Sequence, residues 1–330
     1  MGSVTVVRPP ALRPGARVAL VAPAGPLLER DDLTRSCELC HTLGFEPVLG
    51  THAGARAGFF AGTDAQRLAD LNAALADPAI DAVWCIRGGV GLTRILDRVD
   101  YDGFARRPKP VIGFSDVTAL LNALHRVTGA VTFHGPMARA AMSAFSRQHF
   151  ERVLGQAEAA GRLGCLPVPA DVLVPQRERI VSLVPGTAEG PLVGGNLTLL
   201  QTLVGTRFLP DLDGAILFLE DVGEDLYRVD RTLAHLHLAG LLERLAGVVV
   251  GRFTDMPRTT SDGAMGFDEV LAHWFEPRRI PTAYGFPVGH IDEQWTLPLG
   301  VRARLDASAG ELELLEPAVG APAVAAANGD

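Results

Sequence analysis

Ser115 stands at an abrupt change in sequence pattern. The apolar stretch 110–114 ends at this serine, and a helical pattern carried by Val117, Leu120 and Leu124 begins directly after it. A serine on such a sharp strand-to-helix turn is exposed at the carboxyl edge of a sheet, which is the geometry of a nucleophile elbow. The flanking residues do not form Gly-x-Ser-x-Gly, so this stretch alone favours Ser115 as a helix cap over Ser115 as a nucleophile.

A glycine-rich turn follows another apolar stretch. Gly88, Gly89 and Gly91 come after residues 82–86, but their spacing matches neither a Walker loop nor a dinucleotide fingerprint. The simpler alternative is a tight turn. Because glycine lets the backbone approach a ligand closely, we interpret the turn as a source of amides that, with the amide of Asp116, could form an oxyanion hole.

Two of the nine histidines lie at strand ends beside glycine. His134 precedes Gly135 after one short predicted strand, and His290 follows Gly289 after another. A serine nucleophile needs an adjacent base, so the two histidines are rivals for that role beside Ser115. No pair of histidines has the ligand spacing of a zinc site such as His-Glu-x-x-His, so we expect neither a metal nor a cofactor.

A histidine base also needs a carboxylate on its other ring nitrogen, which fixes the tautomer and stabilises the imidazolium. Glu220 ends the apolar stretch 215–219, and its carboxylate is useful only if it meets a cation or an imidazole. A carboxylate at a strand tip is more often solvated, and Asp221 and Glu224 are rivals for the orienting role.

Strands and helices alternate along the first half of the chain. Short apolar stretches occur at 17–26, 46–49, 82–86, 110–114 and 130–133, with amphipathic stretches such as 29–43 and 64–76 between them. This alternation is typical of a doubly wound parallel sheet with right-handed crossovers. Ligands bind such sheets outside the carboxyl ends of the strands, where the Gly88 turn, Ser115 and His134 all lie.

The second half has shorter elements and is predicted to be a mixed α/β unit. Residues 139–166 are helical in pattern and then rich in Gly and Ala, and residues 167–185 hold prolines with little periodicity. We therefore expect an N-terminal parallel α/β domain over residues 1–160, a linker over 161–185 and a smaller C-terminal β/α domain over 186–330.

Composition narrows the class of protein. The chain has 330 residues, 48% of them apolar and 21% charged, with a formal charge of -8, which is ordinary for a soluble protein of about two domains. Its Lys and Arg residues are scattered, so no nucleic-acid partner is expected, and no apolar stretch approaches a membrane span. Four cysteines and an N-terminus without an export signal predict a cytoplasmic protein.

These motifs together resemble the LD-carboxypeptidase family of serine peptidases, which also contains the microcin C self-immunity peptidases. The matching stretches occur in the family's order and cover nearly the whole chain: Val21-Ala22-Pro23-Ala24-Gly25, Arg87-Gly88-Gly89, Gly113-Phe114-Ser115-Asp116, His134-Gly135-Pro136, Gly194-Gly195-Asn196-Leu197, Leu219-Glu220-Asp221-Val222-Gly223-Glu224 and Gly289-His290.

The resemblance implies a Ser-Glu-His triad with Ser115 as nucleophile, His290 as base and Glu220 as its orienting group. It implies an oxyanion hole at the amides of Gly89 and Asp116. It also implies an open, flavodoxin- or amidotransferase-like parallel sheet followed by a smaller swivelling β/α domain. The substrate it implies is a cytoplasmic murein tetrapeptide that loses its terminal D-alanine from an L,D bond during peptidoglycan recycling.

Such a substrate is anionic and needs a basic group for its free carboxylate. Arg87, Arg228 and Arg231 are the candidates, because arginine suits bidentate binding of carboxylates. Each of them could equally be a partner in a surface salt bridge. Gly88 and Asn196 are further candidates for contact with substrate.

Two other functions compete with this one. An immunity-type peptidase would cleave peptidyl-nucleotide conjugates, but residues 161–185 lack the tryptophan with which that branch stacks a nucleobase, and this favours the muropeptide branch. A non-catalytic α/β ligand-binding protein would use Ser115 only as a cap. We expect the protein to be a homodimer.

Overall fold

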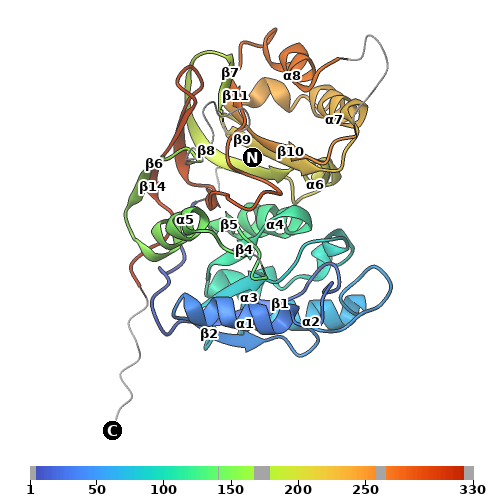
Figure 1. Cartoon of the computed structure of the whole chain (residues 1–330), viewed down its shortest axis with the longest axis vertical. Helices are drawn as coiled ribbons and strands as arrows, with labels where there is room; N and C mark the ends of the chain where they lie inside the picture. The colour runs from blue at the N-terminus through green and yellow to red at the C-terminus, as the bar shows by residue number, and fades with distance from the viewer. Residues whose placement is uncertain (1–4, 140, 167–178, 258–264, 323–330) are drawn as a thin grey trace, which may run out of the picture.

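Two β-sheets, one mainly from each half of the chain, lie one above the other in the computed structural model (Figure 1). The structure describes residues 5–139, 141–166, 179–257 and 265–322. Helices pack on both sheets, so the architecture is the α/β class that the strand–helix alternation predicts. None of the helices within those residues is both long and apolar enough to cross a membrane.

The first sheet is the doubly wound parallel sheet that was predicted. Its six strands have the order β12-β5-β4-β3-β1-β2, and all neighbours are parallel except β12 and β5. Strands β1 to β5 lie in the spatial order β2-β1-β3-β4-β5, which is the order of flavodoxin-like sheets. Such sheets bind ligands where the strand order reverses. The strands are β1 (Arg17–Val21), β2 (Glu46–Leu49), β3 (Ala82–Cys85), β4 (Val111–Gly113), β5 (Thr132–His134) and β12 (Leu297–Leu299).

Local sequence explains most of these elements. Strands β3 and β4 are buried along their whole length, which requires the continuous apolar stretches that the sequence contains. Helix α2 (Asp64–Ala76) begins at a capping box formed by Thr63 and Gln66. The other elements of this half are α1 (Asp32–Thr42), α3 (Tyr101–Arg106), α4 (Thr118–Thr128), α5 (Ala144–Gly155) and the short helices η1 (Leu92–Arg94), η2 (Leu96–Arg98) and η3 (Ser115–Val117).

The second sheet has eight strands in the order β6-β14-β13-β8-β9-β10-β11-β7. Its centre, from β8 to β11, is parallel, and the strands on either side are antiparallel. The strands are β6 (Ala159–Leu163), β7 (Val181–Val184), β8 (Thr187–Asn196), β9 (Ile216–Val222), β10 (Gly247–Thr254), β11 (Thr282–Tyr284), β13 (Arg302–Asp306) and β14 (Glu311–Pro317). The helices are α6 (Leu197–Leu203), α7 (Leu226–Leu238), α8 (Phe267–Phe275) and the short η4 (Leu242–Arg244).

The structure corrects the expected domain boundaries. The expected linker 161–185 includes the end of β6 and all of β7, both of which belong to the second sheet, while residues 167–178 lie outside the described residues. Strand β12, expected in the C-terminal domain, instead closes the edge of the first sheet by pairing with β5. The pairing partners of these strands are distant in sequence, so local periodicity does not predict which sheet each strand joins.

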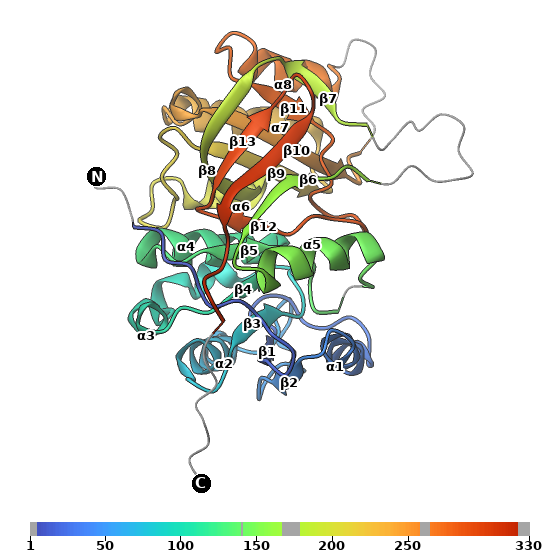
Figure 2. The ribbon, with the colours of Figure 1, turned by 90° about the vertical axis from the view of Figure 1, so that its left-hand side faces the viewer.

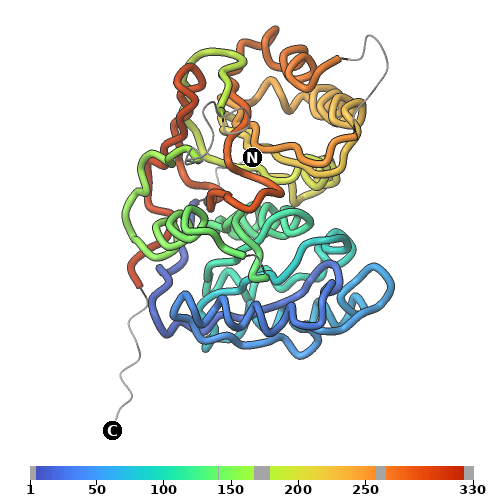
Figure 3. Tube along the Cα trace, viewed as in Figure 1, coloured from blue at the N-terminus to red at the C-terminus, as the bar shows by residue number. Residues whose placement is uncertain are grey.

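The two ends of the chain also meet. Val7 forms a bridge with Ala130 and Pro10 forms one with Gly320, so the N-terminal segment and the segment after β14 run side by side (Figures 2 and 3). Together with β12, these contacts join the two halves on one side of the molecule.

Helix α4 lies between the two sheets (Figure 2). The side-chain amide of Asn122 donates to the carbonyl of Gly194 at 2.9 Å, and the hydroxyl of Thr118 accepts from the amide of Asn196 at 3.0 Å. A Cβ on Gly195 would lie 2.6 Å from the Thr118 side chain. The start of α4, just after Ser115, is therefore fixed against the end of β8.

Candidate active site

Ser115 occupies a strained turn between β4 and α4. Its φ of 59° lies in the left-handed region, which costs a residue with a Cβ about 1 kcal/mol. No side-chain capping hydrogen bond is present at the start of η3. The alternative that Ser115 is a helix cap is therefore wrong, and the strained, half-buried serine has the backbone of a nucleophile elbow.

The glycine loop after β3 packs directly on this serine. A Cβ at Gly88 would lie 2.8 Å from Cβ and 3.0 Å from Oγ of Ser115, so only glycine fits there. Gly89 has a φ of 114°, and a Cβ there would lie 2.8 Å from Cα of Gly25. The amide of Gly25 also donates to the carbonyl of Gly88 at 2.9 Å. The loop after β1 thus packs on the glycine loop, and the glycine loop packs on Ser115.

His290 and Glu220 form a hydrogen-bonded pair. The distance from Nδ1 of His290 to Oε2 of Glu220 is 2.8 Å. Gly289, with a φ of 126°, allows this approach, because a Cβ there would lie 3.0 Å from Cβ of Glu220. Since Nδ1 is occupied by the carboxylate, Nε2 is the ring nitrogen left for the cleft that His290 shares with Ser115.

Glu220 is completely buried, which differs from the predicted strand tip. Strand β9 continues to Val222 between β8 and β10, so the carboxylate lies inside the sheet. Burial raises the pKa of Glu220, while the hydrogen bond and charge of His290 oppose that rise. A buried carboxylate needs such a partner to stay ionised.

The two rival carboxylates are engaged elsewhere. Asp221 accepts hydrogen bonds from the side chains of Asn196 and Thr198, at 2.7 and 2.9 Å, and from the amide of Thr198 at the start of α6. Glu224 faces Arg228 at 3.9 Å. Of the three candidates, only Glu220 is hydrogen-bonded to His290.

His134 does not face the cleft. Its side chain is fully buried, with the rings of Phe114 and Phe218 at centroid distances of 5.7 and 5.2 Å. Burial lowers the pKa of His134 to about 3, so it is neutral at physiological pH. The ring of Phe114 also contacts His290, at 4.8 Å. Between the two histidines, the geometry therefore favours His290 as the base.

The cleft that holds Ser115 and His290 has a volume of about 580 Å³. It is bounded by the glycine loop on one side and by the segment after His290 on the other. Its lining residues are Arg87, Gly88, Gly89, Phe114, Ser115, Met137, Arg139, Ala141, Val222, His290, Ile291, Asp292 and Gln294. The sequence analysis missed Arg139, although its position five residues after His134, just past a strand end, was a usable signal.

Three predicted substrate contacts are placed elsewhere. The side chain of Asn196 is buried, where it caps α6 through the amide of Leu199 and donates to Asp221. Arg228 and Arg231 lie exposed on α7, with their guanidinium groups 5.9 and 5.3 Å from the ring of Tyr227. None of the three lines the cleft, whereas Arg87 and Gly88 do.

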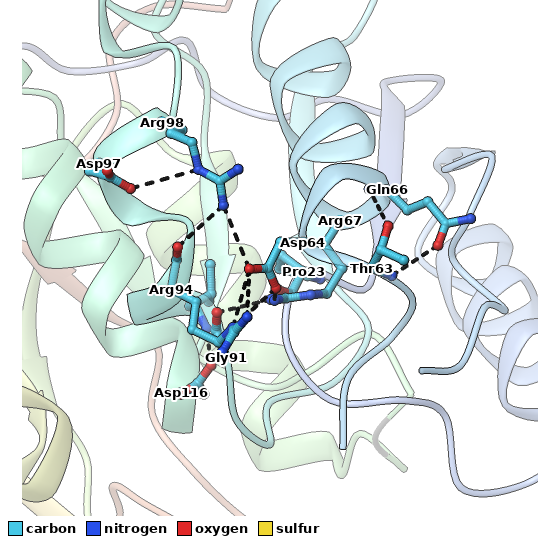
Figure 4. Close-up of polar contacts among 11 residues, drawn as sticks. Pro23, Thr63, Asp64, Gln66, Arg67, Gly91, Arg94, Asp97, Arg98 and Asp116 are labelled. Atoms are coloured by element: carbon cyan, nitrogen blue, oxygen red, sulfur yellow. Dashed lines mark hydrogen bonds and ion pairs between the residues drawn. The ribbon is translucent and has the colours of Figure 1, made fainter. Parts of the chain in front are cut away.

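A buried polar network supports the far side of the glycine loop (Figure 4). Nη1 of Arg67 donates to the carbonyls of Pro23 and Gly91, at 2.6 and 3.0 Å, and its Nη2 donates to Asp64 at 2.6 Å. Arg94 binds the same carboxylate at 3.0 Å. The side chain of Arg67 is completely buried, so the network links the loop after β1 to the loop after β3.

The carboxylate of Asp116 holds the same loop from the serine side. Its Oδ2 accepts a hydrogen bond from the amide of Leu92 at 2.9 Å. Burial raises the pKa of Asp116 to about 6, although the amides of Leu92 and Gly91 and the charge of Arg67 favour the ionised form. The residue after Ser115 is thus bonded to the end of the glycine loop.

We expect Asp116→Asn to be more stable than wild type at pH 8, by on the order of 2 kcal/mol. The pKa of Asp116 is about 6 in the folded protein and lower in the unfolded chain. At pH values between the two, the carboxyl is mostly protonated in the folded protein and mostly ionised in the unfolded chain. Wild-type stability therefore falls as pH rises through that window, and the asparagine removes this loss. Denaturant titrations at pH 8 and pH 5 check the prediction, because the difference should narrow at pH 5. A variant that is equally destabilised at both pH values would contradict it.

No group of three or more His, Cys, Asp or Glu residues that could hold a metal occurs among the residues with described structure. The chemistry available at the cleft is that of a strained serine, a histidine–carboxylate pair and backbone amides. This set of groups is sufficient for nucleophilic acyl transfer.

Comparison with known proteins gives matches to two family models. The LD-carboxypeptidase N-terminal domain matches residues 18–135, and the LD-carboxypeptidase C-terminal domain matches residues 189–305. The murein tetrapeptide carboxypeptidase of Pseudomonas aeruginosa is 36% identical over 297 residues, which cover 88% of this chain and 93% of that protein.

Two further relatives show the range of the similarity. The microcin C7 self-immunity protein MccF of Escherichia coli is 27% identical, over 82% of this chain and 84% of that protein. The crystal structure of muramoyltetrapeptide carboxypeptidase from Oxalobacter formigenes is 32% identical and superposes with a TM-score of 0.76, covering 91% of this chain and 98% of that one. The two-domain fold is common to this chain and that structure.

Proposed function

Because this chain belongs to the LD-carboxypeptidase family and is a serine-type carboxypeptidase, we propose that it releases the terminal D-alanine from murein tetrapeptides by hydrolysis of an L,D bond. Ser115, His290 and Glu220 act as the catalytic triad. The observation that carries this proposal is the 2.8 Å hydrogen bond between His290 and the buried Glu220, beside a cleft that contains the strained Ser115.

In the first step Oγ of Ser115 attacks the carbonyl carbon of the L,D bond while Nε2 of His290 takes the hydroxyl proton. Glu220 holds Nδ1–H and stabilises the imidazolium that forms. The oxygen of the tetrahedral intermediate is stabilised by the amides of Gly89 and Asp116. His290 then protonates the nitrogen of D-alanine, the C–N bond breaks, and an acyl-enzyme is left.

In the second step a water molecule gives its proton to His290 and attacks the acyl-enzyme carbonyl. The tetrahedral intermediate collapses, the proton returns to Oγ of Ser115, and the shortened peptide leaves with a new carboxylate. The fixed glycine loop supports this cycle, because oxyanion donors contribute most when they need no reorganisation during the reaction.

The main competing function is that of an immunity-type peptidase acting on peptidyl- or aminoacyl-nucleotide conjugates. The similarity to the MccF self-immunity protein supports it. The absence of tryptophan from residues 161–185 and the higher identity to a murein tetrapeptide carboxypeptidase favour the muropeptide substrate. A non-catalytic ligand-binding role does not agree with membership of a peptidase family. A cytoplasmic place in peptidoglycan recycling and a homodimeric state are part of the proposal.

Incubation of the protein with purified murein tetrapeptide should yield tripeptide and free D-alanine in equal amounts, measured by mass spectrometry. A tetrapeptide ending in L-alanine and an aminoacyl sulfamoyl adenosine serve as alternative substrates, and Ser115→Ala serves as the inactive control. Cleavage of the nucleotide conjugate with no release of D-alanine would support the immunity-type function instead. Cleavage of neither substrate class would contradict both.

A further inference from the structure

Two arginines from different loops line the cleft beside Ser115. Arg87 follows β3 and directly precedes the glycine loop, while Arg139 follows β5. We propose that the two guanidinium groups together bind the C-terminal carboxylate of the substrate and so restrict the enzyme to removal of the last residue. This inference rests on the proposed function and adds a carboxylate subsite to it.

Neither guanidinium is neutralised by the protein over the described ranges. Among the residues that the structure describes, no carboxylate lies within 4.0 Å of Arg87 or Arg139, and this includes Asp292, which lines the same cleft. The negative charge of Asp32 acts on both arginines, but from beyond ion-pair distance. The charge of Asp32 is already compensated by Arg35 at 2.8 Å and by the amides of two residues before α1.

The two positive charges also act on each other. Partial burial is the largest cause that lowers the pKa of Arg87, and the charge of Arg139 is the next. Like charges that are partly withdrawn from water are stabilised when an anion enters between them. A carboxylate has two acceptor oxygens, which suit the planar donor fork of arginine.

Arg87 is held in a fixed position relative to the reacting groups. Its Nη1 donates to the carbonyl of Pro26 at 2.6 Å and would lie 2.7 Å from a Cβ on Gly25, so the guanidinium lies across the loop after β1. The next residue along the chain, Gly88, packs on Ser115. A carboxylate bound by Arg87 would therefore lie in the same cleft as Ser115 and close to it, as removal of a single C-terminal residue requires.

The test compares two forms of one tetrapeptide, with a free C-terminal carboxylate or a C-terminal carboxamide. We expect wild-type kcat/KM to be at least about a hundredfold higher for the acid. Arg139→Gln should lose about tenfold to a hundredfold in kcat/KM for the acid, as loss of charge-assisted hydrogen bonds predicts. Its kcat/KM for the amide should stay the same. Arg147→Gln, which changes an exposed arginine on α5 paired with Glu151, is the matched control and should change neither value.

Arg87→Gln should reduce the preference for the acid in the same way. If it does not fold because its bond to Pro26 is lost, Arg139→Gln alone decides the question. Equal losses for acid and amide, or an unchanged acid-to-amide ratio, would overturn the proposal, because a purely structural arginine does not distinguish the two substrates.

Binding separates this proposal from the catalytic one. The affinity of Ser115→Ala for N-acetyl-D-alanine and for N-acetyl-D-alaninamide can be measured by calorimetry without turnover. Preference for the acid that disappears in the Ser115→Ala, Arg139→Gln double variant supports the subsite even if murein tetrapeptide is not the substrate. No preference for the acid contradicts the subsite, whatever the fate of the proposed function.

Discussion

Ser115→Ala should reduce kcat by roughly ten-thousand-fold or more, because the alanine leaves no atom to form the acyl-enzyme. The fold should not change, since alanine keeps the Cβ and the hydroxyl makes no capping hydrogen bond. We expect the free energy of unfolding to differ from wild type by less than about 0.5 kcal/mol. Release of D-alanine and a denaturant titration measure the two quantities on the same preparations.

Ser115→Gly separates strain from chemistry at the same position. Glycine adopts a φ of 59° without steric cost, so this variant should be as inactive as Ser115→Ala but more stable, by about 1 kcal/mol. A strained residue that lowers stability and is needed for turnover is typical of functional sites. Ser115→Ala with more than a few per cent of wild-type activity would remove this serine from the role of nucleophile.

Ser308→Ala is a suitable control for both variants. The Ser308 hydroxyl accepts a hydrogen bond from the amide of Gly186 at 2.9 Å in an exposed turn between β13 and β14. Its removal should cost some stability and no activity. Loss of activity without loss of stability in Ser115→Ala then identifies the Ser115 hydroxyl as a group needed for the reaction.

The five parallel strands of the first sheet could be predicted because their signals are local. The bounds of β2 and α2 agree residue for residue with the predicted stretches, since an apolar run, a capping residue and an amphipathic period each lie within a few positions of one another. The place of Ser115 at a strand-to-helix turn is likewise a local property of residues 110–121. The sequence therefore predicted both the position of Ser115 at this turn and the edge of the sheet where it lies.

Other features depend on partners far away in sequence. No strand was predicted over residues 159–163, which lie in a region that is helical in pattern and then rich in Gly and Ala, but these residues form β6 by pairing with β14. Arg67 falls in an amphipathic helix, where an arginine is normally exposed, and its burial depends on carbonyls of Pro23 and Gly91. Arg139 gains significance only because its loop returns to the cleft next to Arg87.

Glu220 shows the same limit at the site itself. A carboxylate after an apolar stretch is ordinarily a solvated strand end, and the pairing of β9 with both β8 and β10 buries Glu220. The bond to His290 joins residues 70 positions apart. The family motif, rather than the pattern of the strand, identified this glutamate from the sequence.

Glu220→Gln should lower kcat by about a hundredfold or more and leave KM nearly unchanged. The amide keeps the shape of the carboxylate but can favour the wrong tautomer of His290 and cannot stabilise the imidazolium, and the comparable change in a serine protease costs about ten-thousand-fold. A loss confined to the transition state appears in kcat and not in substrate binding. Steady-state kinetics with murein tetrapeptide measure both constants.

Asp221→Asn and Glu224→Gln are the matched controls, because the three carboxylates lie within five residues of sequence. Asp221 accepts hydrogen bonds from Asn196 and from the start of α6, so Asp221→Asn should lower stability while kcat per folded molecule stays near wild type. Among the described residues, Glu224 forms an ion pair with Arg228 alone. Glu224→Gln should therefore change neither kcat nor the free energy of unfolding.

Stability gives a second, independent readout for Glu220. Burial raises the pKa of this carboxyl, so its ionised form is less favourable in the folded protein than in the unfolded chain. The neutral glutamine should therefore make the resting protein at least as stable as wild type at pH 8, while turnover is lost. Near-wild-type kcat for Glu220→Gln, with a collapse for Asp221→Asn or Glu224→Gln, would remove Glu220 from the triad.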